Sequence, residues 1–166
     1  MNPKRLTELA LMTAIALIIF VIELQFPDIK IPGVKLGLAN IVTVWGVFRY
    51  KPSEVAMVVF CRVILGAMFS GNIPALIYSI SGSLMCLIAM IALRNVLDKN
   101  YIWLCSIIGA IFHNIGQIAA AVITLQSMAF IAYFPVLTLT GSIAGLFTGL
   151  CAQNLLNRLP SSVDKK

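Results

Sequence analysis

Long apolar runs separated by short polar breaks dominate the sequence. Pro, Gly or charged residues bound each run, which is typical of helices that cross a lipid bilayer. Pro52-Ser53-Glu54, before the third run, is a plausible helix start. The pattern predicts six helices, over residues 7–24, 37–48, 53–69, 73–93, 101–125 and 129–155.

The lengths of these runs and breaks predict the topology. The second run is shorter than the ~20 residues that normally span the hydrocarbon core. The breaks at 70–72 and 126–127 are very short and favour antiparallel neighbours, whereas the break at 25–36 is the longest. We therefore expect an all-α integral membrane bundle of six transmembrane helices, formed by a single domain over residues 1–166.

The composition supports placement in lipid. Of 166 residues, 60% are hydrophobic and 11% are charged, whereas soluble domains carry about 25% charged residues. No stretch is polar enough to form a second, soluble domain, so a soluble enzyme is excluded. The N-terminal run lacks a small-residue cleavage site and is expected to stay as a helix.

The net charge of +6 comes from short basic clusters, not from a continuous stripe, which argues against a nucleic-acid partner. With a cytoplasmic N-terminus, nine basic residues fall inside and two outside, and both termini are cytoplasmic. The outer two are Lys30 and Lys35, and Arg62 lies within a helix. The inner nine are Lys4, Arg5, Arg49, Lys51, Arg94, Lys99, Arg158, Lys165 and Lys166.

Catalytic and cofactor motifs are missing. No two of the six carboxylates lie within four residues of each other, and neither DDxxD, GxSxG nor a Walker motif occurs. The cysteines show no CxxC spacing and are interpreted as apolar packing residues. We expect no metal, no cofactor and no catalytic residue, so active transport would need a partner or an ion gradient.

Polar residues inside the apolar runs are the candidate binding site, because such groups are costly in lipid. His113, Asn114 and Gln117 share one side of a helix. Arg62 has two open interpretations, a pair with Glu23 that holds helices together or a contact to substrate. Serines of the fourth run are expected to bond to their own helix. The pattern predicts a polar chamber open to the outside, with the candidate substrate-binding residues Lys35, Asn40, Arg62, Tyr78, His113, Asn114 and Gln117.

Small residues at four-residue spacing predict close helix contacts. Gly141, Gly145 and Gly149 form such a row in the sixth run, and Ala10 and Ala14 form a shorter one in the first.

Four blocks carry a family resemblance. They are 31–43 (IPGVKLGLANIVT), 62–66 (RVILG), 79–82 (SISG) and 109–117 (GAIFHNIGQ). These blocks resemble the Gx transporter family, often labelled heptaprenyl diphosphate synthase component I. That family resembles the substrate-binding S components of energy-coupling factor (ECF) importers, which are multi-pass proteins of prokaryotic plasma membranes.

The resemblance implies partners. In S components an AxxxA motif of the first helix contacts a transmembrane coupling subunit that works with two ATPases, and Ala10 and Ala14 match that motif. The expected function is capture of a small molecule, with a basic bias that favours an anionic one. The alternatives are an accessory component of a polyprenyl diphosphate synthase and a proton-coupled transporter with His113 or Glu23 as relay.

Overall fold

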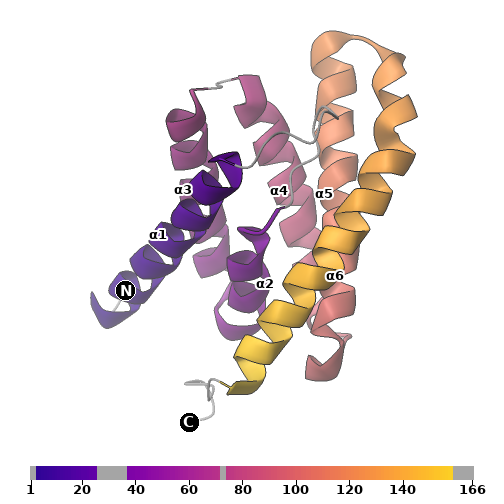
Figure 1. Cartoon of the computed structure of the whole chain (residues 1–166). Coiled ribbons are helices and arrows are strands. Elements are labelled where there is room, and N and C mark those ends of the chain that lie inside the picture. Colours follow the sequence, from indigo (N-terminus) through magenta and orange to yellow (C-terminus); the bar gives the residue numbers. More distant parts are fainter. Residues whose placement is uncertain (1–2, 26–36, 72–73, 159–166) are drawn as a thin grey trace.

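The computed structural model describes residues 3–25, 37–71 and 74–158, and these form six α-helices and no strand (Figure 1). Two 3₁₀ segments, η1 (Lys99–Tyr101) and η2 (Met128–Tyr133), precede the last two helices. The all-α bundle predicted from the apolar runs is thereby confirmed. The helices are α1 (Pro3–Gln25), α2 (Asn40–Arg49), α3 (Pro52–Ser70), α4 (Pro74–Leu93), α5 (Ile102–Leu125) and α6 (Phe134–Arg158).

Five of these helices are long and apolar enough to cross a membrane, and α2 is the exception. Its 10 residues rise only ~15 Å, about half of the ~30 Å hydrocarbon core. Successive helices alternate in direction, and both termini lie in the lower half of Figure 1. Six helices are present among the described residues, but α2 cannot span the bilayer by its own length.

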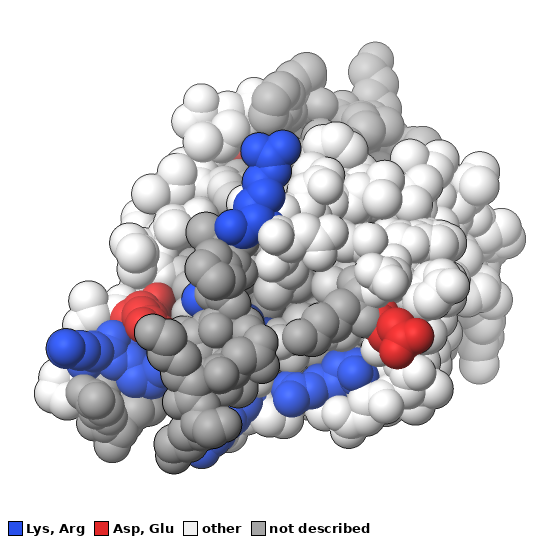
Figure 2. Space-filling view, turned by 90° about the horizontal axis from the view of Figure 1, so that it is seen from below, with Lys and Arg blue, Asp and Glu red and all other residues white. Residues whose placement is uncertain are grey.

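The basic residues gather where α1, α3 and α5 begin and α2, α4 and α6 end. We call this the basic end. It carries Lys4, Arg49, Lys51, Arg94 and Arg158 and is seen from below in Figure 2. The described residues assigned to the cytoplasm thus share one end of the bundle, while the orientation in the membrane stays a prediction. Lys30, Lys165 and Lys166 lie outside the described residues.

Glycines let α5 pack closely between α4 and α6. A Cβ atom on Gly116 would lie 2.6 Å from the carbonyl oxygen of Ser81 on α4. A Cβ atom on Gly149 would lie 2.6 Å from Cα of Trp103 on α5. Gly145 likewise faces the α5 backbone, so the predicted glycine row of the sixth run is a helix contact.

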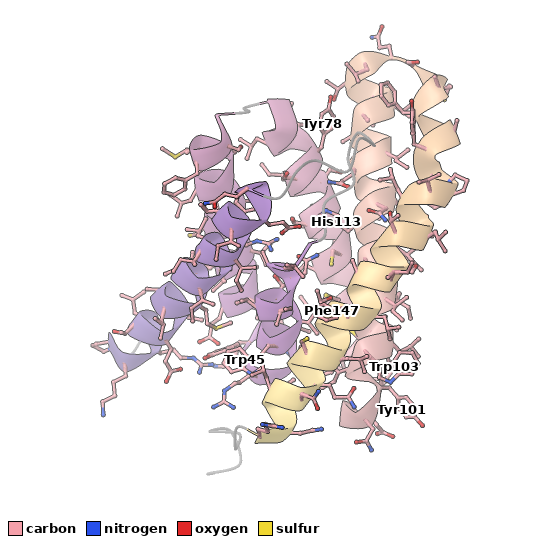
Figure 3. The ribbon with its side chains drawn as sticks, in the orientation of Figure 1. Trp45, Tyr78, Tyr101, Trp103, His113 and Phe147 are labelled. Carbon is pink, nitrogen blue, oxygen red and sulfur yellow. The ribbon has the colours of Figure 1, made fainter. Side chains whose placement is uncertain are left out.

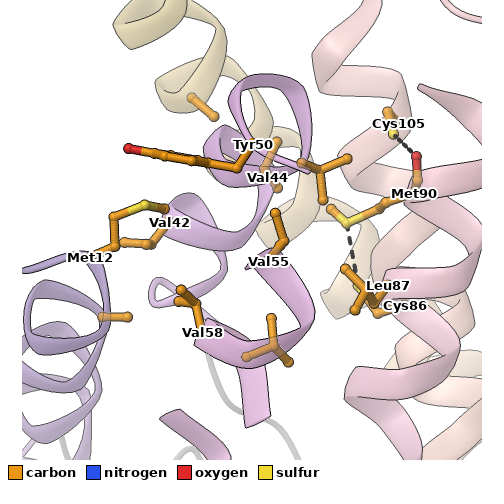
Figure 4. Close-up of a cluster of buried hydrophobic side chains, with 14 of the residues drawn as sticks. Met12, Val42, Val44, Tyr50, Val55, Val58, Cys86, Leu87, Met90 and Cys105 are labelled. Carbon is orange, nitrogen blue, oxygen red and sulfur yellow. Dashed lines mark hydrogen bonds between the residues drawn. The ribbon is translucent and has the colours of Figure 1, made fainter. Parts of the chain in front are cut away.

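A cluster of buried apolar side chains forms the core of the bundle (Figure 4). Met90 of α4 is 1% exposed, and the thiol of Cys105 donates to its carbonyl oxygen over 3.7 Å. Every helix contributes to this cluster, which includes Met12, Val44 and Val55. The sequence-based interpretation of the cysteines as packing residues fits Cys86 and Cys105, which are buried free thiols.

An ion pair joins α1 to α3 at the basic end, and a cation–π contact joins α1 to the residue that follows α2. Arg5 donates through Nε and NH2 to both carboxylate oxygens of Glu54, at 3.0 and 2.9 Å. The Arg5 guanidinium also lies over the Tyr50 ring, 4.0 Å from its centroid. The bidentate pair holds the start of α1 against the start of α3.

Candidate functional site

A cavity of about 620 Å³ lies among all six helices. Its volume is within the usual range of small-molecule sites. Six of the seven predicted binding residues line it, and Lys35 lies outside the described residues. Figure 3 shows His113 at mid-height of the bundle and Tyr78 nearer the upper end. The six are Asn40, Arg62, Tyr78, His113, Asn114 and Gln117.

Arg62 lies at the centre of the cavity wall. Its NH1 group donates to Oδ1 of Asn40 at the start of α2, over 3.2 Å. The positive charge of Arg62 also interacts electrostatically with His113 of α5 and with Glu23 of α1. A guanidinium has five N–H donors. Within the described residues, 3–25, 37–71 and 74–158, Arg62 makes one hydrogen bond, to Asn40. Arg62 therefore has donors left for a ligand.

Glu23 lines the cavity at the end of α1. Its carboxylate accepts a hydrogen bond from the backbone N–H of Gly37, which precedes α2. Gly37 has a φ of +66°, a left-handed conformation that suits glycine. Glu23 thus ties the start of the second helical segment to the end of α1, while its charge lies near Arg62.

Asn114 lines the cavity but is also part of the packing between α5 and α6. Its side chain is 7% exposed, and Nδ2 donates to the carbonyl oxygen of Leu137 over 2.6 Å. A Cβ atom on Gly141 would lie 2.4 Å from that nitrogen. Binding by Asn114 stays a prediction, and its substitution would also disturb the α5–α6 contact.

The side chain of His113 has an unpaired polar atom, unlike the hydrogen-bonded amide nitrogen of Asn114. Its ring packs against α4, where a Cβ atom on Gly82 would lie 2.9 Å from Cε1. Its Nδ1 atom is buried without a hydrogen-bond partner in the described part of the chain. Since a buried, unpaired ring nitrogen is costly, His113 is suited to bind a polar group inside the cavity.

Further aromatic residues complete the wall, and the candidate binding residues predicted from the sequence did not include them. Phe20 of α1, Phe130 of η2 and Tyr133 of η2 all line the cavity. Their apolar surroundings in sequence gave no signal, because an aromatic residue in a transmembrane run is usually lipid-facing or core. Only the fold shows that they share a chamber with Arg62.

Ala10 and Ala14, the predicted partner contacts, lie on the surface. Both are exposed, whereas Leu9, Met12 and Ala16 of the same helix point into the bundle. Exposed Leu6, Leu11 and Ile18 lie on the same helix, so α1 presents an apolar outer face.

The comparisons with known proteins support one family. No curated protein and no solved structure matches the chain. A family model described as heptaprenyl diphosphate synthase component I matches residues 12–155. Because this match covers most of the 166 residues, the chain belongs to that family.

Proposed function

We propose that this chain is the substrate-capture subunit of an ECF-type importer. One observation carries the proposal: polar side chains from all six helices, among them Glu23 of α1 and Thr148 of α6, line a single cavity inside an otherwise apolar bundle. Polar groups at such depth in lipid are costly unless they serve a pathway or a ligand. The cavity and its donors give the chain the means to hold a small molecule.

Delivery then depends on partners. The chain has no Walker motif, so in this proposal ATP hydrolysis belongs to two ATPases joined through a transmembrane coupling subunit. The exposed row of Ala10 and Ala14 allows a partner helix to approach closely. The proposed cycle is entry from outside, closure of the cavity, and release inward as the bundle rotates against that subunit.

Native mass spectrometry of the purified protein tests capture. Wild type is expected to retain a small molecule, and Arg62→Gln to lose it because the principal cation of the cavity is gone. Arg158→Gln is the matched control, since Arg158 is exposed at the basic end. Equal retention by wild type and Arg62→Gln would contradict the proposed site.

The second candidate is a membrane accessory of a prenyl diphosphate synthase, and the family description favours it. In that case the chain holds or anchors a separate synthase and does no chemistry itself. Among described residues, no three Asp, Glu, His or Cys side chains group as they would around a metal ion. Co-purification with an aspartate-rich soluble synthase, together with an empty cavity, would support this candidate over capture.

A further inference from the structure

The cavity is long. On α5 its lining runs from Ser106 to Leu125, a rise of ~28 Å that approaches the thickness of the hydrocarbon core. A space of that length has room for an extended molecule.

A second, wholly apolar space lies beside the first. It is a groove of about 460 Å³ on the surface of α5, η2 and α6. Ile115, Val122, Met128 and Phe134 are among the residues that line it. Ile118 lines both the groove and the cavity, so this one side chain lies between them.

The η2 segment gives the two spaces a common wall. Met128 and Ile131 line the groove, whereas Phe130 and Tyr133 line the cavity. A 3₁₀ segment has three residues per turn and therefore presents two distinct faces over a short length. Ile118 and η2 thus separate the cavity from the groove on the lipid side of the bundle.

The cavity offers a cationic donor, Arg62, to an anion, and the carboxylate of Glu23 also lines it and lies near that charge. The unpaired Nδ1 of His113 lies on the facing helix. Phosphate and carboxylate oxygens match a guanidinium in geometry and charge. Glu23 accepts the N–H of Gly37, while Asn40 is the one described hydrogen-bond acceptor of Arg62.

We propose that the captured molecule is an anionic amphiphile, which deepens and rests on the proposed function. Arg62 binds its phosphate or carboxylate head group, and its apolar chain passes Ile118 into the groove between α5 and η2. The molecule therefore enters sideways from the membrane. A compact, water-soluble anion would satisfy Arg62 but would leave the adjoining groove without a role.

Photo-crosslinking in phosphatidylcholine nanodiscs tests this inference. The probes are dodecyl monophosphate and dodecanol, each with a diazirine at the tail end, and inorganic phosphate serves as a competitor without a tail. Dodecyl phosphate is expected to label α5 and η2 at least ~10-fold more than dodecanol, as a charged hydrogen-bonded head group implies. Inorganic phosphate is expected to compete poorly.

Variants separate the head-group site from the groove. Arg62→Gln is expected to lower dodecyl phosphate labelling to the dodecanol level, with Arg158→Gln as control. Ile118→Trp is expected to reduce labelling by closing the passage, and Ile115→Trp, within the groove, is a second variant in case the first does not fold. Ile143→Trp is the control, because Ile143 is 63% exposed and lines neither space.

Four results would overturn the inference. Equal labelling by both probes, or labelling unchanged in Arg62→Gln, would show that only bulk lipid occupies the groove. Absence of labelling, with a water-soluble molecule retained by wild type and lost in Arg62→Gln, would reject the amphiphile and leave the capture function standing. If wild type shows neither labelling nor a retained small molecule, both the amphiphile and the capture function are rejected.

Discussion

Glycine positions decide how closely the helices approach one another at the scale of single residues. In lipid, helix association relies on close packing and interhelical hydrogen bonds. Gly116 allows the hydroxyl of Ser81 to reach its carbonyl oxygen, a bond of 2.8 Å between α4 and α5. His113 and Gln117 flank this contact, so the α4–α5 approach also sets the position of the cavity wall.

Gly116→Ala is expected to destabilise the bundle by about 1–3 kcal/mol, as overpacking usually does. The added methyl group would meet the rigid carbonyl of Ser81 at 2.6 Å. Thermal unfolding in detergent measures the effect. Gly46→Ala is the control, because its nearest neighbour at 3.1 Å is the flexible methyl end of Met12. Equal losses in both variants would contradict the steric argument.

Residue depth could be predicted from the sequence, but residue partners could not. Counting along apolar runs placed Arg62, His113 and Gln117 at mid-membrane, and they share one cavity. The count could not show that Ser81 would bond to α5 and not to its own helix, contrary to our prediction. Nor could it show the bond from Asn114 to Leu137. Such bonds depend on the rotation of neighbouring helices, which no local pattern encodes.

At the scale of elements, α2 needs support from its neighbours. Its 10 residues are too few for a helix that is stable in isolation. Arg94 at the end of α4 donates to the carbonyl oxygens of Val47 and Tyr50, at 2.9 and 3.1 Å. A cation at a helix C-terminus satisfies unpaired carbonyls and complements the helix dipole.

Arg94→Met is expected to loosen the end of α2 by about 0.3–1 kcal/mol, the usual value of a cation at a helix C-terminus. Hydrogen–deuterium exchange of the peptide over residues 40–50 should then accelerate, while α5 stays protected. Arg158→Met, which removes a cation from the exposed last turn of α6, should leave that peptide unchanged. Unaltered exchange in Arg94→Met would show that packing alone holds α2.

The exposed outer face of α1 leads to a second prediction about a single element. Leu11 is 61% exposed beside Ala10 and Ala14, so bulk added to this row changes no internal contact. Ala10→Leu with Ala14→Leu is expected to abolish co-purification with a coupling subunit while leaving retention of the small molecule intact. Ala92→Leu, at an exposed alanine of α4, is the control. Undiminished co-purification would show that the coupling subunit binds another surface of the protein.

Element boundaries followed closely from the apolar runs except in the sixth. The run over 129–155 predicts one continuous helix, whereas the structure has η2 before α6 begins at Phe134. Pro135 explains the change, because proline lacks an N–H and suits the first turn of a helix. This boundary has a consequence for the site, since η2 supplies Phe130 and Tyr133 to the cavity.

The apolar cluster and the cavity meet inside the bundle. Met90 and Val44 belong to the cluster and also line the cavity. Trp45 and Trp103 lie near the lower end in Figure 3, as expected for aromatic residues at a membrane interface. The bundle thus combines a packed apolar core with a chamber lined partly by polar side chains.

The orientation of the bundle in the membrane is predicted from charge. Arg5, Arg49, Arg94 and Arg158 share the basic end, and an excess of Lys and Arg marks cytoplasmic segments. In a cysteine-free background, Gln126→Cys, between α5 and η2, should react with a membrane-impermeant maleimide in intact cells. Arg158→Cys should react only after permeabilisation, and the reverse result would contradict the orientation. An inverted bundle would reverse the predicted orientation and would contradict entry of a ligand from outside.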